Sequence, residues 1–263
     1  SASFLGGPLA LSGGSQKDGA IAIRLAGTLS ADGMRRSAPA PAVARLATRL
    51  SGSTRYSGTI GVREHRLNVA VESELAGLGL EFPAPLNKAQ ETALPLRFVL
   101  EGEPTVEGVG RDQLRLSLGN TVFARYQRSH QPRAPWVVER GGIGVNVPAP
   151  QPDEGMMINV DMKSVNVDAW LAAARAIAGD GEGEGNTTSA SGPNFSQYVV
   201  PTTIAARATE LFVADRRMAD VVVGATHRGN VWLANLPSRQ ASGYLSWSEQ
   251  QGGVGKVTAR LAF

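Results

Sequence analysis

The chain lacks cysteine, has few aromatic residues and contains no long hydrophobic run. Without cysteine it has no disulfide bond, thiol nucleophile or thiolate metal site. Aromatic residues make up only 6% of its 263 residues, against 42% for all hydrophobic residues, so the core must consist mainly of Leu, Val, Ile and Ala. The sequence contains no run of about twenty apolar residues, which is the length that a membrane-spanning helix needs. The first residues also lack the basic and apolar order of a signal peptide.

Both ends of the sequence have the pattern of a strand. The first residue is not methionine, and the alternation of Val257, Ala259, Leu261 and Phe263 continues to the last residue. We therefore expect a soluble segment of a longer protein.

The formal net charge of +3 and the isoelectric point of about 9.5 invite a nucleic-acid interpretation. However, the basic residues are scattered, and arginines such as Arg97 and Arg115 alternate with apolar residues, as on the solvent face of a strand. The densest basic and aromatic cluster consists of Arg125, Tyr126, Arg128, His130, Arg133 and Trp136. Such side chains can contact bases or lipid phosphates, but Pro132 and Pro135 favour a hairpin tip. We expect no nucleic-acid partner.

Catalytic motifs are not apparent. The three histidines, His65, His130 and His227, each lie in a polar, turn-like setting typical of a surface imidazole. The sequence has no Gly-x-Ser-x-Gly elbow and no His-Glu-x-x-His pair. We therefore expect that the protein is not an enzyme.

The segment from Asp180 to Asn186 resembles the first half of a calcium-binding loop, because carboxylates alternate with glycines. Its twelfth position is Ser191, where such loops need a bidentate glutamate, and no second helix follows. We interpret residues 179–197 as a solvated Gly- and Ser-rich loop and expect neither a metal nor a cofactor. The glycines of 252–256 likewise indicate a hairpin turn before the last strand rather than a phosphate loop.

The most informative stretch runs from Leu67 to Leu96. Two apolar sets of opposite parity follow one another there: Leu67, Val69, Val71 and Leu75, then Leu78, Leu80 and Phe82. Because side chains alternate between the faces of a strand, the change across Ala76-Gly77 predicts a bulge or a re-aimed sheet. Pro83 and Pro85 then end the strand.

A strand followed by a helix occurs twice. Residues 21–29 alternate and lead through Ser30 into a capped helix that carries Val43, Leu46 and Leu50. Residues 158–162 alternate in the same way before a second helix, which is capped at Asn166 to Asp168 and closed by Gly179. These patterns predict two strand-helix-strands units, residues 1–150 and 151–263.

The rest of the sequence contains short segments in which apolar and polar residues alternate: 96–100, 114–118, 122–126, 143–147, 204–213, 221–225, 231–234 and 244–247. Turn signals separate them, among them Gly119-Asn120, Gly141-Gly142 and Arg228-Gly229-Asn230. The predicted fold class is mainly β (α+β), a long antiparallel, curved sheet with two short capped helices. Two arrangements stay open: the halves pack face to face as a sandwich, or one apolar face stays partly uncovered, as at lipid or partner sites.

A succession of degenerate segments favours the second arrangement. They are Leu75-Ala-Gly-Leu-Gly-Leu-Glu-Phe-Pro-Ala-Pro-Leu-Asn-Lys88, and then residues 94–97, 114–119, 139–144, 148–152, 167–170, 210–220 and 243–247. In this order, spanning about residues 21–247, they resemble the YhdP family of AsmA-like bacterial envelope proteins. Members are long proteins with one N-terminal inner-membrane helix and a large periplasmic body.

The resemblance implies an open hydrophobic groove through which phospholipid passes between the inner and outer membranes, and it implies no catalytic residue. This chain would be an internal periplasmic segment that meets membranes only through its parent protein. We expect acyl chains to gain roughly 0.8 kcal/mol per methylene buried on a Leu/Val/Ile wall. Candidate wall residues are Val69, Val71, Leu78, Leu80, Phe82, Leu116 and Leu118. The alternative is a structural or interaction module whose edge strands pair with neighbouring segments of the parent chain.

Overall fold

The computed structural model describes residues 2–4, 6–15, 19–37, 41–178, 196–237, 242–248 and 256–262. The calcium-like segment, most of the 179–197 loop and the glycines at 252, 253 and 255 lie outside the described residues. Contacts divide the chain into two compact units. The first comprises residues 1–119, 128–136 and 169–194, and the second comprises residues 120–127, 137–168 and 195–263.

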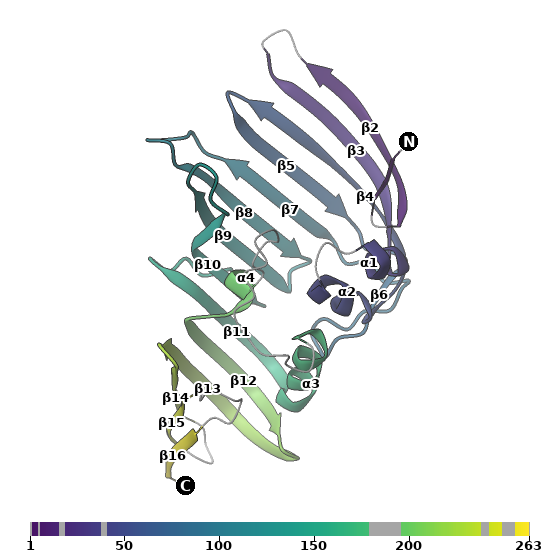
Figure 1. Cartoon of the computed structure of the whole chain (residues 1–263). Coiled ribbons are helices and arrows are strands. Elements are labelled where there is room, and N and C mark those ends of the chain that lie inside the picture. The colour runs from purple at the N-terminus through teal and green to yellow at the C-terminus, as the bar shows by residue number, and fades with distance from the viewer. Residues whose placement is uncertain are drawn as a thin grey trace. The chain divides into compact units, whose positions relative to one another are not determined.

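The first unit contains an open sheet in which every neighbouring pair of strands is antiparallel (Figure 1). In order across the sheet, its strands are β1 (Ala2–Phe4), β2 (Gly7–Ser15), β3 (Ile21–Ser30), β4 (Leu50–Arg63), β5 (Arg66–Ser73), β7 (Leu96–Gly102) and β8 (Gly110–Leu118). The short strand β6 (Leu78–Leu80) pairs only with the beginning of β4. Two helices, α1 (Ala31–Ser37) and α2 (Pro41–Ala47), lie between β3 and β4.

The second unit contains a mixed sheet. Its strands are β10 (Val137–Val145), β11 (Gly155–Asn166), β12 (Thr203–Val213), β13 (Arg216–Arg228), β14 (Val231–Pro237), β15 (Ser242–Ser248) and β16 (Lys256–Ala262). The pairs β10–β11 and β11–β12 are parallel, and the others are antiparallel. Strand β9 (Val122–His130) and helix α3 (Val167–Ala178) have residues in both units, and helix α4 (Ser196–Val199) belongs to the second.

The mainly β, unclosed architecture is therefore as predicted, with two differences. Two strand pairs are parallel rather than antiparallel. The segments after β10 and β11 each carry the chain back to the edge of the sheet at which the preceding strand began, so the next strand runs in the same direction. After β11 the return takes residues 167–202, a length that suits a crossover connection. The described residues also form four helical segments rather than two, and Leu50, predicted in a helix, begins β4.

The return after β10 explains why Gly141 and Gly142 are not a turn. Both lie inside β10, and the proline-rich segment 148–150 packs against one face of that strand. A Cβ at Gly142 would lie 2.1 Å from the carbonyl oxygen of Pro150, and a Cβ at Gly144 would meet Pro148. The glycines at alternate positions thus remove the side chains from this face, which allows the returning backbone to approach.

The parity change after β5 reflects a re-aimed strand rather than a bulge, because the chain leaves β5 and forms a new short strand. Strand β5 ends at Ser73, and Leu75 and Gly77 both adopt positive φ (48° and 88°). Gly77 is required there, since a Cβ would lie 2.4 Å from the carbonyl oxygen of Ser53. The chain thereby leaves β5 and pairs as β6 with the start of β4.

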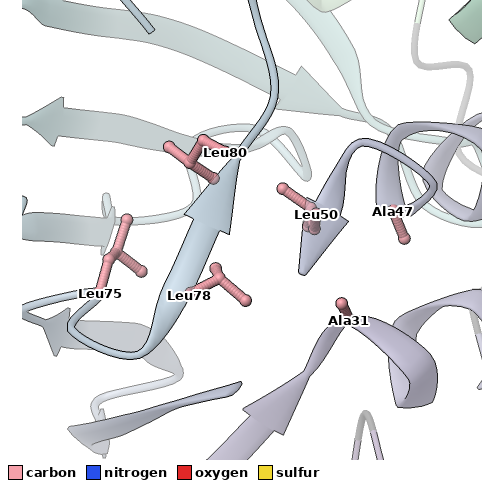
Figure 2. Close-up of a cluster of buried hydrophobic side chains, with 6 residues drawn as sticks. All are labelled: Ala31, Ala47, Leu50, Leu75, Leu78 and Leu80. Carbon is pink, nitrogen blue, oxygen red and sulfur yellow. The ribbon is translucent and has the colours of Figure 1, made fainter. Parts of the chain in front are cut away.

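A compact hydrophobic cluster forms where β6, α1 and α2 meet the beginning of β4 (Figure 2). Its buried members are Ala31, Ala47, Leu50, Leu75, Leu78 and Leu80. The hydroxyl of Ser30 accepts a hydrogen bond from the Gly33 amide (3.1 Å), so the predicted cap of α1 is confirmed. The ammonium of Lys88 is buried beside the cluster and donates to the carbonyl oxygens of Leu78 and Ala89. Burial lowers the pKa of Lys88, and nearby Glu91 partly counteracts this effect.

Truncation of the cluster tests its contribution to stability. Leu78→Ala removes a side chain that is only 3% exposed, and we expect it to cost about 2–5 kcal/mol of unfolding free energy. The matched control is Leu67→Ala in β5, whose side chain is 43% exposed and whose loss should cost under about 1 kcal/mol. Urea unfolding followed by circular dichroism measures both. Equal midpoints for the two variants would contradict the assignment of this cluster as the core of the first unit.

A second substitution tests the glycine face of β10. Gly142→Val should displace segment 148–150 and raise hydrogen exchange of residues 146–154, because the added side chain overlaps the Pro150 carbonyl. Gly224→Val in β13 is the control, since a Cβ there meets no atom within 4 Å. Unchanged exchange in the first variant would show that the segment does not depend on this contact.

Candidate functional site

The cross-strand register of the first unit gathers apolar side chains on one face of the sheet, called here the first apolar face. It consists of three rows across β2, β3, β4, β5, β7 and β8. The rows are Leu11, Leu25, Gly58, Val71, Phe98 and Leu116; Gly13, Ile23, Ile60, Val69, Leu100 and Leu114; and Ser15, Ile21, Val62, Leu67, Gly102 and Asp112. The face is apolar almost throughout because every strand keeps the same alternation in register with its neighbours.

The opposite face of the same strands carries small or polar side chains. It carries exposed residues such as Ser12, Arg24, Ser57, Thr59, Glu72, Arg97 and Arg115. Arg97 pairs with Glu72 (3.6 Å) and Arg115 pairs with Glu101 across neighbouring strands. A shallow hollow of about 600 Å³ lies on this face, where Ala10, Ala26 and Ala70 leave the surface low. The sheet thus has one polar and one apolar side.

Only one end of the first apolar face meets the hydrophobic cluster. Leu29, Leu96 and Leu118 lie at that end and pack against the cluster around α1, α2 and β6. Toward the other end, Leu67 is 43% exposed, and Leu11 at the outer edge of the sheet is 57% exposed. We call the end that packs against the cluster the covered end. The three rows that continue away from it contain large apolar side chains that are partly or fully exposed, except for Leu114, which is buried.

The predicted wall residues divide between the two regions. Val69, Val71 and Leu116 lie in the rows of the first apolar face and are partly buried. Leu118 lies at the covered end, and Phe82 packs against the same cluster. Leu78 and Leu80 are buried inside the cluster. Leu78, Leu80 and Phe82, which follow the parity change, therefore belong to a surface distinct from that of Val69 and Val71. Contact between lipid and any of the seven predicted wall residues stays a prediction.

The end of the first apolar face opposite the covered end carries a charged and aromatic group. Asp112, 3% exposed, accepts two hydrogen bonds from the Arg128 guanidinium, one of them from Nε at 2.8 Å. That guanidinium lies over the Trp136 ring (4.8 Å to its centroid), and His130 packs beside Trp136 with 4.4 Å between ring centroids. The imidazole of His130 is partly exposed, as a surface position predicts, but it packs against an aromatic ring. Its ring is partly buried because it lies against Trp136 and fills the space above Gly110.

The second unit has an apolar face of its own, called the second apolar face. Its rows are Ile143, Ile158, Ile204, Ala225, Ala234 and Leu245; Val145, Val160, Ala206 and Val223; and Met162, Ala208 and Val221. Exposed polar residues on the reverse side include Asp161, Lys163 and Arg207. Segment 148–150 packs on the reverse side of β10, since Gly142 and Gly144 alternate with Ile143. This connection therefore leaves the apolar side of β10 free.

The second apolar face ends in an aromatic row. His227 stacks on Trp232 with 4.7 Å between ring centroids and 15° between planes, and Trp232 lies opposite Trp247 in the ladder. Trp247 is 41% exposed. The Nε2 atom of His227 is buried and has no hydrogen-bond partner among the described residues. The ring of His227 is thus partly buried against tryptophan, like that of His130, whereas His65 lies in an exposed turn as predicted.

Sequence reasoning missed this row, although a signal was present. The turn at Arg228-Gly229-Asn230 was recognised, and a two-residue loop at Gly229-Asn230 places His227 opposite Trp232. Tyr126, by contrast, was assigned to a basic cluster but is a packing residue. Its hydroxyl donates to the carbonyl oxygen of Tyr198 in α4 (2.8 Å), and burial, aided by Tyr198, raises the pKa of Tyr126 to about 12.

No group of three or more histidine, aspartate or glutamate side chains in the described part of the chain is arranged to hold a metal ion. None of the helices in the described ranges is both long and apolar enough to span a bilayer.

Comparison with known proteins identifies the family of the chain. No curated protein and no solved structure matches the chain. The family model described as YhdP protein matches residues 1–263, the whole length of the sequence. The chain therefore belongs to the YhdP family, a family of bacterial envelope proteins.

Proposed function

We propose that this chain is a periplasmic segment whose apolar sheet faces hold the acyl chains of phospholipids that move between the inner and outer membranes. In this way it would contribute to the permeability barrier of the envelope, without catalysis. The observation that supports the proposal most directly is the apolar row of the first apolar face from Leu11 to Leu116, in which only Gly58 lacks an apolar side chain. A solvent-accessible apolar surface of this extent is typical of a lipid or partner site.

The energetics suit a transient lipid ligand. If roughly ten methylenes of an acyl chain leave water for such a face, the transfer free energy favours binding by about 8 kcal/mol. The loss of translational and conformational freedom on association offsets part of this gain, so a lipid is held without being trapped. Charged headgroups would stay in water, since burying them without partners is costly.

The face itself is tested by neighbouring residues of one strand. Val69→Glu and Val71→Glu each place a carboxylate on the first apolar face, whereas Ala70→Glu places the same group between them on the polar face. We expect each valine variant to lower bound phospholipid by about tenfold, since about two methylene contacts are lost. Ala70→Glu should retain the lipid. Native mass spectrometry and lipid extraction of the purified chain measure the bound amount.

Thermal unfolding of all three variants serves as the control for folding. If the valine variants fold and carry as much lipid as Ala70→Glu, the apolar face is not the binding surface. If even the unmodified chain carries no phospholipid, the proposal of lipid conduction by this segment fails.

The second candidate function is an interaction module, and the edge of the first sheet favours it. Strand β1 pairs only with residues 7–9 of β2, so residues 10–15 form an outer edge that contains neither charge nor proline. Such an edge is a template for another strand. The partner would be a neighbouring segment of the parent chain.

Lysine substitution tests the edge. Ser12→Lys on β2 should abolish any strand addition, because an edge lysine opposes pairing, whereas Ala26→Lys on the same face of the inner strand β3 should leave it intact. Sedimentation of the purified chain would show the effect as a change in self-association. Equal self-association of both variants would contradict a role for this edge.

A further inference from the structure

We propose that a histidine–tryptophan pair in each unit marks the headgroup end of bound phospholipid, with the acyl chains lying along the strands away from it. The inference rests on the function proposed above and assigns an orientation to the lipid. The pairs are His130 with Trp136 in the first unit and His227 with Trp232 in the second.

Each pair stands at one end of an apolar face. In the first unit, polarity changes along β8 from Leu118 at the covered end, through Leu116 and Leu114, to Asp112. The carboxylate of Asp112 is held by Arg128, which in turn lies over Trp136. Along β8 an apolar stretch, in which Leu118 and Leu116 are partly buried and Leu114 is buried, therefore ends at a charge pair beside an aromatic ring.

The second unit repeats this order with different residues. Along β13, Val221 is fully buried, Val223 is partly buried, Ala225 follows, and His227 closes the face beside Trp232. Trp247 extends the aromatic row onto β15. Arg228 and the turn follow directly. Two unrelated stretches of sequence thus end an apolar face with a histidine beside a tryptophan ring.

The order matches that of a phospholipid at a membrane surface. Tryptophan and tyrosine concentrate at the level of the headgroups and esters, because their rings are apolar with one polar atom. His227 adds a buried Nε2 without a partner among the described residues, a group whose hydrogen bond a ligand ester or phosphate would complete. The Tyr56 hydroxyl, one row from the first apolar face toward Leu29, is likewise buried without a partner among the described residues. The tryptophan ring beside each histidine, and not the unpartnered atom alone, therefore assigns the headgroup to this end.

The dimensions agree. Leu118 and Asp112 are six positions apart on β8, as are Val221 and His227 on β13, so each apolar stretch is about 20 Å long at roughly 3.3 Å per residue. One leaflet of a bilayer contributes about half of a hydrocarbon thickness of roughly 30 Å. An extended acyl chain therefore fits along the strands, with its ester at the aromatic end.

Tryptophan fluorescence quenching tests the orientation in the full 263-residue chain. One reporter variant keeps only Trp136, and another keeps only Trp232 and Trp247, with phenylalanine at the remaining tryptophans of the chain. Each is loaded with phosphatidylethanolamine brominated either near the carboxyl end or near the methyl end of its acyl chain. Quenching should be about threefold stronger with carboxyl-end bromine, since the two label positions differ by much of a chain of roughly 15 Å.

The matched control moves the reporter along the same strand. With all four native tryptophans replaced by phenylalanine, Val223→Trp places the ring four positions from His227, and its quenching should favour methyl-end bromine. Should this variant not fold, the two reporters at the aromatic ends decide the question by themselves. Equal quenching by the two lipids, or stronger quenching by methyl-end bromine at Trp136 or Trp232, would overturn the orientation.

Lipid binding is measured in the same samples by native mass spectrometry, so that the two proposals fail separately. Bound lipid with the wrong quenching ratio rejects the orientation and leaves the proposed function standing. The absence of bound lipid rejects both.

Discussion

The structure depends on one constraint, the alternation of side chains along strands that stay in register with their neighbours. This alternation decides which residues share a face of the sheet. Val69, Val71, Phe98 and Leu116 share a face only because β5, β7 and β8 pair without a slip. A shift of one residue in any strand would move its apolar residues to the face of Arg97 and Glu72. Lateral contact between neighbouring rows then supplies much of the packing.

Two of the connections in the described part of the chain lie away from the apolar rows. In the first unit, α1, α2 and β6 gather into one cluster at the end of the face around Leu29, Leu96 and Leu118. In the second unit, Gly142 and Gly144 hold a returning segment against the polar side of β10. In both cases the non-strand backbone lies away from the apolar rows. The molecule consequently combines a small true core with large, partly exposed apolar faces, which is the combination that the proposed lipid function needs.

Sequence reasoning succeeded where alternation was strong. Strands such as β3, β7 and β12, the cap at Ser30 and the start of α3 were predicted from periodicity and capping residues. It failed for β4, a central strand whose Ser51, Gly52, Ser53 and Thr54 resemble a loop. Here pairing with β6 and β3 overrides weak local preference. Gly141 and Gly142 misled in the same way, because close approach of another segment and a turn both select glycine.

The sequence by itself determined the strand-rich class, the apolar parity of each strand, the absence of cysteine chemistry and the family resemblance that the family model confirms. These properties are local or compositional, so they can be read without knowing which strands are neighbours. Only the tertiary structure decided that Leu78 and Leu80 are buried while Val69 and Val71 line a broad face, and that His130 and His227 lie on tryptophans. Those outcomes follow from strand order and register, which depend on contacts between residues far apart in the chain.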